Sequence, residues 1–335
     1  MTRILIADPL EDSGLAILRA TGADVKVVAA DERARLPELV AEVDALVVRS
    51  ATKVTRALLE AAKKLRVVGR AGVGVDNVDV DAATERGVLV VNAPNANLVS
   101  ATEHTFALLL GLARSLPAAD ASMKRGEWDR KTFVGVELQG KTLGIVGLGR
   151  IGQRVASRAR AFEMRVVAYD PFLEPEQAKR IGVELLALDD LMAQSDVVTL
   201  HAPFSKATKN LIDARRLGLM KPQALFINCG RGGLVDEEAL LAALEAGKIA
   251  GAGLDVYEDE PTHRHALTGH SRVIATPHIG AQTKEAQERI AIETAHMVLA
   301  ALDGEVPAAA VNPSVRKPAV ESVSERSERA QRERQ

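Results

Sequence analysis

The sequence contains little cysteine, few aromatic residues and no long apolar run. Its single cysteine among 335 residues excludes an intramolecular disulfide and fits a reducing cytosol. Phe, Trp and Tyr make up only 3% of the chain, so a core must consist mainly of Val, Leu, Ile and Ala. Residues 98–112 are apolar, but Glu103 and His104 interrupt them and the run is too short to span a bilayer. We therefore expect a cytoplasmic protein with no membrane partner.

Charge and size are those of an ordinary globular protein. The 335 residues are enough for two domains, and 47% of them are hydrophobic while 26% are charged. The formal net charge of −2 gives no indication of a nucleic-acid partner. The first eight residues show no basic region followed by a long apolar segment, so we expect no signal peptide.

The most informative stretch is 141–152, KTLGIVGLGRIG, which joins a short apolar run to a segment with helical spacing. Gly147, Gly149 and Gly152 give the spacing G-x-G-x-x-G, in which the glycines permit a tight turn, approach of a pyrophosphate and close helix packing. The start of the helix favours a phosphate. Asp170 ends the next apolar run and is placed to accept hydrogen bonds from a ribose. We interpret the stretch as a dinucleotide-binding site; a turn with a purely structural role is the alternative.

Before this stretch, short apolar runs alternate with amphipathic segments. We expect strands at 3–7, 25–28, 45–48, 67–68 and 88–92, and helices at 14–20, 36–43, 55–62 and 80–86. This order predicts a parallel sheet that is covered on both faces. A long apolar helix follows at 98–114, and a polar segment around 119–131 leads to the glycine stretch.

Six later runs predict the strands of a complete dinucleotide-binding sheet. They lie at 143–146, 165–169, 197–200, 225–228, 249–255 and 273–275, and a helix at 283–302 and an extended piece at 309–312 follow them. We predict an α/β protein with two doubly wound parallel sheets. A Rossmann domain at 98–278 is inserted into a discontinuous, flavodoxin-like substrate domain at 1–97 and 279–315. We expect the polar tail, 316–335, to be disordered.

Three side chains near predicted strand ends are candidates for catalysis. His278 follows the last strand, and imidazole suits proton exchange near neutral pH, although a linker histidine is the alternative. A carboxylate would orient the imidazole and favour its protonated form, but composition does not choose between Glu260 and Asp259. Arg231 lies between glycines and can hold a carboxylate through two hydrogen bonds, unless it is an ordinary surface arginine.

The other histidines and the cysteine give weaker signals. His263, His265 and His270 match no tight ligand spacing, so we expect no metal site. Cys229 has no histidine close to it in sequence, so we expect a small buried residue near the cofactor and not a nucleophile. His201 ends a predicted strand and is expected near the nicotinamide.

With these residues in view, the chain resembles the D-2-hydroxyacid dehydrogenase family over residues 1–313. The resemblance rests on the glycine stretch and on RSATKVT at 49–55, GRAGVGVDNVD at 69–79, NCGRGG at 228–233, LDV at 254–256 and PHIG at 277–280. It implies a catalytic set of Arg231, Glu260 and His278, with His278 as proton donor and acceptor. It selects Glu260 because this residue directly precedes Pro261.

The resemblance also implies NAD as cofactor and a homodimer built around the NAD-binding domain, which suits the apolar helix at 98–114. Besides the three glycines and Asp170, the expected NAD contacts are Val73, Arg150, Ile151, Ala202, Cys229, Gly230, Arg231, Asp255, His278, Ile279, Gly280 and Ala281.

Within the family, the chain most resembles the members that oxidise D-3-phosphoglycerate at the first step of serine synthesis. That substrate carries a phosphate, and Arg49, Lys53 and Arg70 lie near strand ends of the first domain, at the edge expected to face a cleft. A pocket for lactate or glyoxylate needs no such cations; alternatively, these side chains pair with surface acids. The expected substrate contacts are Arg49, Ser50, Arg70, Gly72, Asn97, Arg231 and His278.

Two other functions are compatible with the same residues, because a fold alone does not fix a function. One is a reductase for glyoxylate, hydroxypyruvate or lactate, and the other is an NAD(H)-sensing corepressor that binds peptides. Larger family members continue into a serine-binding regulatory region. This chain has only the polar tail after Asn312, so we expect no feedback control by serine.

Overall fold

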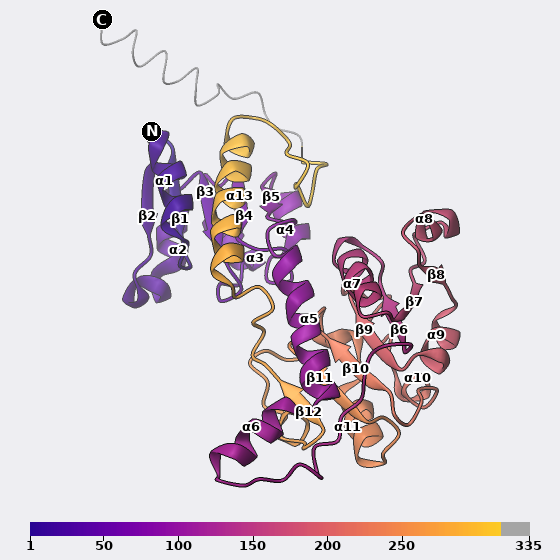
Figure 1. The fold of residues 1–335 in the computed structure, drawn as a ribbon. Coiled ribbons are helices and arrows are strands. Elements are labelled where there is room, and N and C mark those ends of the chain that lie inside the picture. The colour runs from indigo at the N-terminus through magenta and orange to yellow at the C-terminus, as the bar shows by residue number, and fades with distance from the viewer. Residues whose placement is uncertain (316–335) are drawn as a thin grey trace, which may run out of the picture. The chain divides into compact units, whose positions relative to one another are not determined.

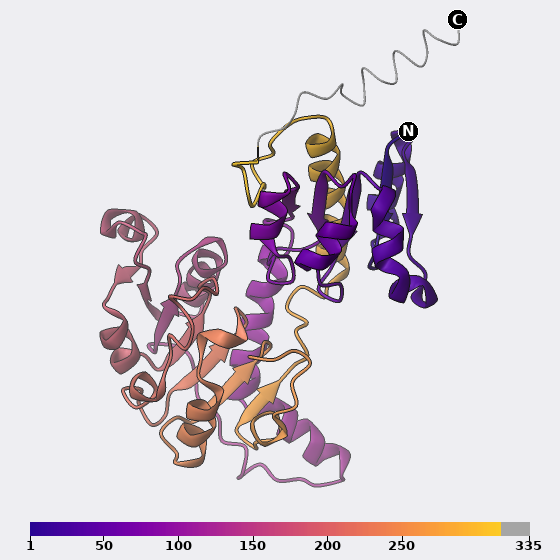
Figure 2. The same ribbon diagram turned by 180° about the vertical axis from the view of Figure 1, so that it is seen from behind.

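The computed structural model describes residues 1–315, which form two compact units. The first unit contains Met1–Asn97 and the described part of the segment that starts at Gln282, and the second is Leu98–Ala281. Each unit has helices on both faces of a parallel sheet (Figures 1 and 2). The predicted fold class, two doubly wound parallel sheets, is confirmed. The predicted tail, 316–335, lies outside the described residues.

The sheet of the first unit has five parallel strands in the order β2-β1-β3-β4-β5. This is the flavodoxin-like order, in which the chain changes direction beside the first strand. The strands are β1 (Arg3–Ile6), β2 (Asp24–Val27), β3 (Ala45–Val48), β4 (Val67–Arg70) and β5 (Leu89–Asn92).

Two hydrophobic clusters cover the faces of this sheet, and neither contains an aromatic residue. Ile4 and Ile6 face one cluster and Leu5 faces the other, because successive side chains of a strand alternate between the faces. Burial of each aliphatic side chain contributes roughly 1.5–3 kcal/mol, so an aliphatic core is sufficient. The helices are α1 (Asp12–Ala20), α2 (Leu36–Leu39), α3 (Arg56–Ala61), α4 (Val80–Glu85) and α13 (Lys284–Leu302), with short 3-10 helices at Ala30–Arg35 and Val40–Glu42.

The chain returns to the first unit after the second unit is complete. α13 packs on α1, β4 and β5, and Ala310 forms an antiparallel bridge with Val91. Asn312 is buried, accepts a hydrogen bond from the N–H of Val90 at 2.8 Å and donates one to the carbonyl of Val88 at 3.0 Å. The first unit is therefore built from two separate parts of the sequence.

The sheet of the second unit has seven parallel strands in the order β12-β11-β10-β9-β6-β7-β8. The order reverses between β6 and β9, and ligands of such sheets bind at this switch point, beyond the carboxyl ends of the strands. The strands are β6 (Thr142–Val146), β7 (Arg165–Tyr169), β8 (Glu184–Leu185), β9 (Val197–Leu200), β10 (Leu225–Asn228), β11 (Gly251–Leu254) and β12 (Val273–Ala275).

Helices cover both faces of the second sheet, and each face has its own hydrophobic cluster. The helices are α5 (Leu98–Ala113), α6 (Leu116–Lys124), α7 (Arg150–Ala161), α8 (Pro175–Arg180), α9 (Leu188–Gln194), α10 (Ala214–Leu217), α11 (Glu237–Glu245) and α12 (His265–Thr268). α5 packs against α7, β10, β11 and β12 of its own unit. Contacts within the unit therefore account for much of the apolar circumference that the sequence shows at 98–114.

The structure corrects the prediction at two points. The second sheet has seven strands and not six, because the two-residue strand β8 has no apolar run to indicate it. Helix α6 forms where the sequence predicts a polar connection, and only Ser122 of this helix is buried. The second unit includes the turn after His278, up to Ala281, and this turn is hydrogen-bonded to Asp255 of the same unit.

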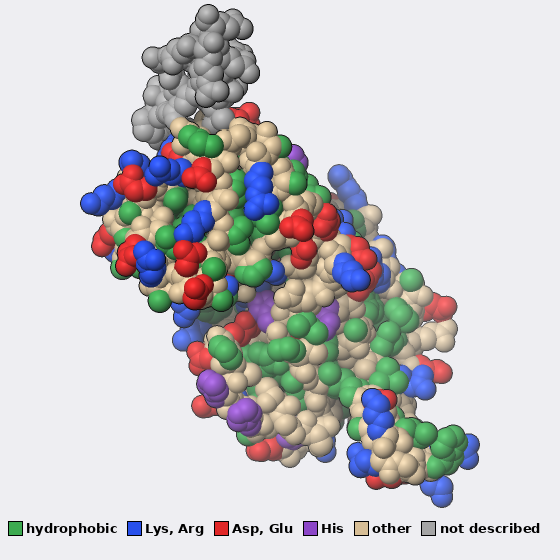
Figure 3. Space-filling view, turned by 90° about the vertical axis from the view of Figure 1, so that its left-hand side faces the viewer, with side chains coloured by type: hydrophobic (Ala, Val, Ile, Leu, Met, Phe, Trp, Pro, Cys, Tyr) green, Lys and Arg blue, Asp and Glu red, His purple; other side chains and the backbone are tan. Residues whose placement is uncertain are grey.

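Surface charge is mixed on the face shown in Figure 3, where basic and acidic side chains are interspersed. This agrees with a net charge close to zero. Among residues 1–315, no helix combines the length and the apolar character that crossing a membrane requires.

Candidate active site

The glycine loop between β6 and α7 is tightly packed at two of its three glycines. Gly147 has a φ of +94°, and a Cβ on it would lie 2.6 Å from the backbone nitrogen of Ala202. A Cβ on Gly152 would lie 2.2 Å from the carbonyl oxygen of Gly147. Gly149 is the N-cap of α7, and a Cβ on it would meet no atom within 4 Å. The loop is therefore tightly packed at Gly147 and Gly152 but open at Gly149, where a phosphate can approach the first amides of α7.

Asp170 directly follows β7, and its carboxylate holds the glycine loop. Its Oδ2 accepts a hydrogen bond from the N–H of Leu148 at 2.9 Å, and its Oδ1 accepts one from the N–H of Phe172 at 3.0 Å. A carboxylate oxygen can accept more than one hydrogen bond, so a ribose hydroxyl can still bind. The sequence predicts only the ribose contact and misses the contact with Leu148. Arg150 and Ile151 begin α7 directly after the loop.

His278 and Glu260 lie in hydrogen-bond contact, beyond the ends of the neighbouring strands β12 and β11. Nδ1 of His278 is 2.6 Å from Oε2 of Glu260, and Oε1 of Glu260 accepts a hydrogen bond from the N–H of Tyr257 at 3.1 Å. The two side chains are 42% and 36% exposed, so solvent reaches the pair. Because an ionised carboxylate only accepts hydrogen bonds, we assign the proton to Nδ1, which leaves Nε2 for a substrate. Of Glu260 and Asp259, the structure pairs Glu260 with the imidazole.

The backbone turn that presents His278 is held by Asp255. His278 has a φ of +54°, in the left-handed region that a non-glycine residue rarely adopts. Asp255 directly follows β11 and is 1% exposed. Its Oδ1 accepts hydrogen bonds from the Thr276 hydroxyl at 2.7 Å and the Ile279 N–H at 2.8 Å, and its Oδ2 accepts one from the Gly280 N–H at 2.8 Å. These bonds support the turn on both sides of His278.

Electrostatics keep Asp255 ionised in spite of its burial. Burial alone would raise the pKa of Asp255, but the hydrogen bonds from His104, Thr276 and the Ile279 N–H lower it overall. Nε2 of His104, on α5, is 3.2 Å from Oδ1 of Asp255. The sequence predicts a contact of Asp255 with NAD, and in the structure both of its oxygens also accept hydrogen bonds from the protein.

Arg231 follows β10, the strand beside β11, so all three predicted catalytic residues come from one edge of the sheet. Asn228, which is fully buried, donates a hydrogen bond to the carbonyl of Arg231 at 2.9 Å and accepts one from the N–H of Gly230 at 3.0 Å. The guanidinium of Arg231 donates to the carbonyl of Gly230 at 2.7 Å. Asn228, at the end of β10, thus fixes the backbone of the residue that carries this guanidinium.

Two further predicted contacts follow β9 and β10. Burial lowers the pKa of His201 to about 4, so this imidazole is neutral at physiological pH. Burial raises the pKa of Cys229 to about 12, with the charge of Asp255 acting in the same direction. The Cys229 thiol is therefore protonated, which argues against a nucleophilic role. Ala202 follows His201 and adjoins Gly147 of the glycine loop.

The predicted substrate loop of the first unit, 49–52, is clamped by two side chains. Oδ2 of Asp8, a buried residue, accepts hydrogen bonds from the N–H groups of Arg49 at 2.7 Å and Thr52 at 3.2 Å. Nδ2 of Asn77 donates to the carbonyls of the same two residues, at 2.7 Å each. The clamp leaves Ser50 exposed at the tip of the loop.

The other predicted residues of the first unit lie after β4 and before α5. Arg70 is the last residue of β4, and Gly72 has a φ of +145°, a backbone conformation that favours glycine. The carbonyl of Val73 accepts a hydrogen bond from Asn92 at 2.6 Å. Asn97 is the last residue of the unit's first segment.

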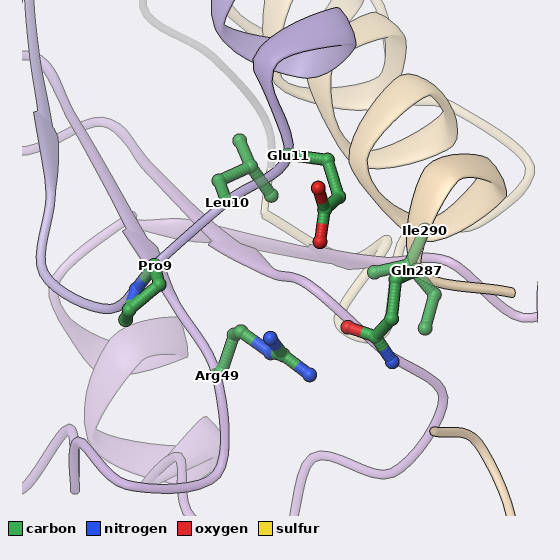
Figure 4. A pocket seen from close by; sticks show the side chains of 6 residues that line it. All are labelled: Pro9, Leu10, Glu11, Arg49, Gln287 and Ile290. Carbon is green, nitrogen blue, oxygen red and sulfur yellow. The ribbon is translucent and has the colours of Figure 1, made fainter. Parts of the chain in front are cut away.

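A shallow surface depression lies beside Arg49 in the first unit. It is lined by Pro9, Leu10, Glu11, Arg49, Gln287 and Ile290, and Figure 4 shows polar ends of Glu11, Arg49 and Gln287 directed toward the same space. The Glu11 carboxylate weakens the positive potential around Arg49. A strongly anionic ligand at this loop would therefore need further donors besides Arg49.

The three clustered histidines of the second unit form no metal centre. Within the part of the chain that the structure describes, no group of three His, Cys, Asp or Glu side chains could hold a metal ion. His270 instead accepts a hydrogen bond through Nδ1 from the N–H of Arg272 at 3.1 Å.

Comparison with known proteins agrees with this geometry. Residues 106–280 match the family described as D-isomer specific 2-hydroxyacid dehydrogenase, NAD binding domain, and the match lies entirely within the second unit. A crystal structure of D-lactate dehydrogenase from Aquifex aeolicus, complexed with NAD and lactic acid, is 32% identical with a TM-score of 0.79. That similarity covers 89% of this chain and 95% of the other.

Two curated relatives are more similar in sequence, and both are named D-3-phosphoglycerate dehydrogenase. The relative from Methanocaldococcus jannaschii is 49% identical over 313 residues, which is 93% of this chain and 60% of the relative. The relative from Mycobacterium bovis is 51% identical over 309 residues, which is 92% of this chain and 58% of the relative. The chain therefore spans about three fifths of the length of these relatives.

The position of Asp170 predicts a preference for NADH over NADPH, because its charge repels a 2′-phosphate. Asp170→Asn keeps an acceptor for the Leu148 N–H but removes the charge. It should therefore lower the ratio of NADH to NADPH affinity about tenfold, while NADH affinity itself stays largely unchanged. Asp170→Ala should also weaken NADH binding, because the glycine loop loses its anchor. Fluorescence titration with both nucleotides measures this. Equal affinities in the unaltered protein would contradict the assignment.

Proposed function

Because the chain belongs to the D-isomer specific 2-hydroxyacid dehydrogenase family, we propose that it oxidises D-3-phosphoglycerate to 3-phosphohydroxypyruvate with NAD. This is the first step of L-serine synthesis and would take place in the cytoplasm. Support comes from the similarity to two curated relatives of that name. The observation that carries the proposal is the 2.6 Å contact between His278 and Glu260, beyond the same sheet edge as Arg231.

The proposed proton acceptor is Nε2 of His278. The Nδ1 contact with Glu260 orients the ring, so neutral imidazole can take the substrate hydroxyl proton at Nε2 as the carbonyl forms. The Glu260 carboxylate then stabilises the protonated ring by its opposite charge. NAD, when bound, supplies the acceptor for the hydride that leaves the same carbon. In the reverse direction His278 returns the proton.

We assign the substrate carboxylate to Arg231. A guanidinium can form two parallel hydrogen bonds to a carboxylate, and Asn228 holds the backbone here through the N–H of Gly230 and the carbonyl of Arg231. Binding the carboxylate in this way fixes the orientation of the neighbouring hydroxyl-bearing carbon. The remaining proposed substrate contacts are Ser50, Arg70, Gly72 and Asn97.

NAD is proposed to bind along the glycine loop and the strand ends of the second unit. The open space above Gly149 fits a pyrophosphate, and the neutral His201 and Cys229 are compatible with a nicotinamide nearby. The proposed contacts are Val73, Gly147, Gly149, Arg150, Ile151, Gly152, Asp170, Ala202, Cys229, Gly230, Arg231, Asp255, His278, Ile279, Gly280 and Ala281.

An enzyme that interconverts a smaller 2-hydroxy acid and its 2-oxo acid, and works mainly as a reductase, is the second candidate. The similarity to D-lactate dehydrogenase from Aquifex aeolicus favours it, because that similarity covers 95% of the other chain whereas the phosphoglycerate relatives are covered only to about 60%. The two candidates differ in whether they need Arg49 and Arg70. The phosphate of D-3-phosphoglycerate requires cationic partners, whereas lactate carries no phosphate.

We also propose that two copies of the chain form a homodimer through the NAD-binding domain. Apolar side chains are exposed on α6 and on the segment after it. Exposure of such a surface to water is unfavourable, so a second copy of the chain is proposed to cover it. These apolar side chains are Leu116, Met123, Trp128, Val134 and Val136, with exposures of 55%, 54%, 76%, 81% and 45%.

His278→Ala should lower kcat about a hundredfold or more, the usual scale of general acid–base catalysis, while NADH affinity, which depends on many other proposed contacts, should fall much less. Glu260→Gln should move the acidic limb of the pH–rate profile for oxidation to lower pH, because the protonated ring loses its counter-charge. Steady-state kinetics and NADH titration measure both effects. His263→Ala, which changes an exposed histidine, is the control. A joint loss of NADH binding and turnover in His278→Ala would show that His278 is structural.

Arg49→Ala should lower kcat/KM for D-3-phosphoglycerate about ten- to a hundredfold, the effect of losing one hydrogen bond to a charged group. Activity on D-glycerate should change little, because D-glycerate has no phosphate. Arg35→Ala, an exposed arginine paired with Glu38 in the same unit, is the matched control. Equal efficiency with the two acids in the unaltered protein would favour the second candidate.

The exposed apolar surface predicts a dimer in sedimentation velocity at micromolar concentration. Trp128→Ser combined with Val134→Asp should shift the protein to monomers, because a charge at the interface is costly to bury. Phe172→Ser changes a side chain that is 92% exposed elsewhere in the second unit and should leave the dimer intact. A monomeric unaltered protein would refute the dimer.

A further inference from the structure

A buried carboxylate from α11 holds the loop that carries Glu260. Glu237 is the first residue of α11 and is only 3% exposed. Its Oε1 accepts a hydrogen bond from the N–H of Glu258 at 2.6 Å, on the amino-terminal side of Glu260. Its Oε2 lies 3.2 Å from Nε of Arg264, on the carboxyl-terminal side. One side chain therefore contacts the loop on both sides of Glu260, through a hydrogen bond at Glu258 and an ion pair at Arg264.

The charges around Glu237 show that this position is costly for a carboxylate. Burial raises the pKa of Glu237, and the nearby charges of Glu258 and Asp259 act in the same direction. The hydrogen bond from the Glu258 N–H and the charge of Arg264 oppose that rise. Arg264 also contacts the carboxylates of Glu258 at 3.1 Å and Glu238 at 3.4 Å. A helix start does not require a buried acid, since Asp236 already caps α11.

The same loop packs against the segment that follows Arg231. A Cβ on Gly232 would lie 1.8 Å from the carbonyl carbon of Tyr257 and 2.4 Å from the backbone nitrogen of Glu258. Gly232 and Glu237 thus contact the Glu260 loop at adjacent points. The Tyr257 N–H in turn donates to Oε1 of Glu260. These contacts connect Glu237 to Glu260 through the backbone of residues 257 and 258.

We propose that Glu237 is a positioning residue for the His278–Glu260 pair. It fixes the backbone of 257–264, so that Oε2 of Glu260 stays within hydrogen-bond distance of His278 Nδ1. It also fixes the loop relative to the segment of Arg231. Glu237 acts through Glu260 and needs no contact of its own with substrate or cofactor. The proposal rests on the proposed dehydrogenase function.

A double-mutant cycle tests whether Glu237 acts through Glu260. Gln at position 237 has one acceptor oxygen and cannot serve both the Glu258 N–H and Arg264. Glu237→Gln should lower kcat about tenfold with NADH affinity unchanged. In a Glu260→Gln background the same change should have less than a twofold further effect. Glu238→Gln, which removes an exposed carboxylate that also contacts Arg264, should be close to neutral. The proposal would be refuted if the fold-losses in kcat of the two single substitutions multiply in the double variant, or if Glu237→Gln leaves kcat unchanged.

Hydrogen–deuterium exchange gives a readout that does not depend on turnover. Peptides covering 257–264 should exchange faster in Glu237→Gln than in the unaltered protein and in Glu238→Gln, and unchanged exchange would refute the proposal. If Glu237→Gln does not fold, Glu237→Asp keeps the charge but is too short to reach the Glu258 N–H and should give the same pattern. The kinetics use whichever 2-hydroxy acid the unaltered protein oxidises best. Failure of D-3-phosphoglycerate as a substrate is thus distinguished from failure of this proposal.

Discussion

The geometry around His278 depends on the buried carboxylate of Asp255. A charge at 1% exposure is stable only if donors replace the lost water, and here the donors are the backbone and side chains of the turn itself. The need to satisfy this charge therefore holds the turn in place. It also keeps His278 in a left-handed conformation that it would rarely adopt alone.

The same arrangement recurs at two other strand ends. Asp8, two residues beyond β1, binds the N–H groups of the loop at 49–52, and Asp170, directly after β7, binds the N–H of Leu148 in the glycine loop. In each case a carboxylate at the carboxyl end of a parallel strand accepts hydrogen bonds from backbone amides of a neighbouring loop. Such bonds are charge-assisted and stronger than those between neutral groups. They give flexible loops the fixed positions that a binding site needs.

Much of this architecture is visible in the sequence, because it depends on local patterns. Four-residue aliphatic runs such as 45–48 indicate buried parallel strands, and the glycine spacing and strand ends indicate Asp170, Arg231 and His278 as site residues. Sequence patterns do not predict a structural feature that depends on contacts between residues far apart in the chain. β8 has two residues and pairs only with β7, so no pattern precedes it. Glu237 stands in the acidic start of a helix, where an exposed side chain is the ordinary expectation, and its burial follows from contacts with Glu258 and Arg264.

The protonated state of Cys229 has a practical consequence for labelling chemistry. Cys229 is the only cysteine in the chain, and because burial raises its pKa to about 12, its thiol stays protonated at neutral pH. Maleimides and similar reagents react with the thiolate, so the natural protein presents almost no reactive sulfur. A cysteine introduced at an exposed position would therefore be modified selectively without removal of Cys229. Fluorophores or spin labels can then be attached singly to either unit, which makes the two units accessible to distance measurements in solution.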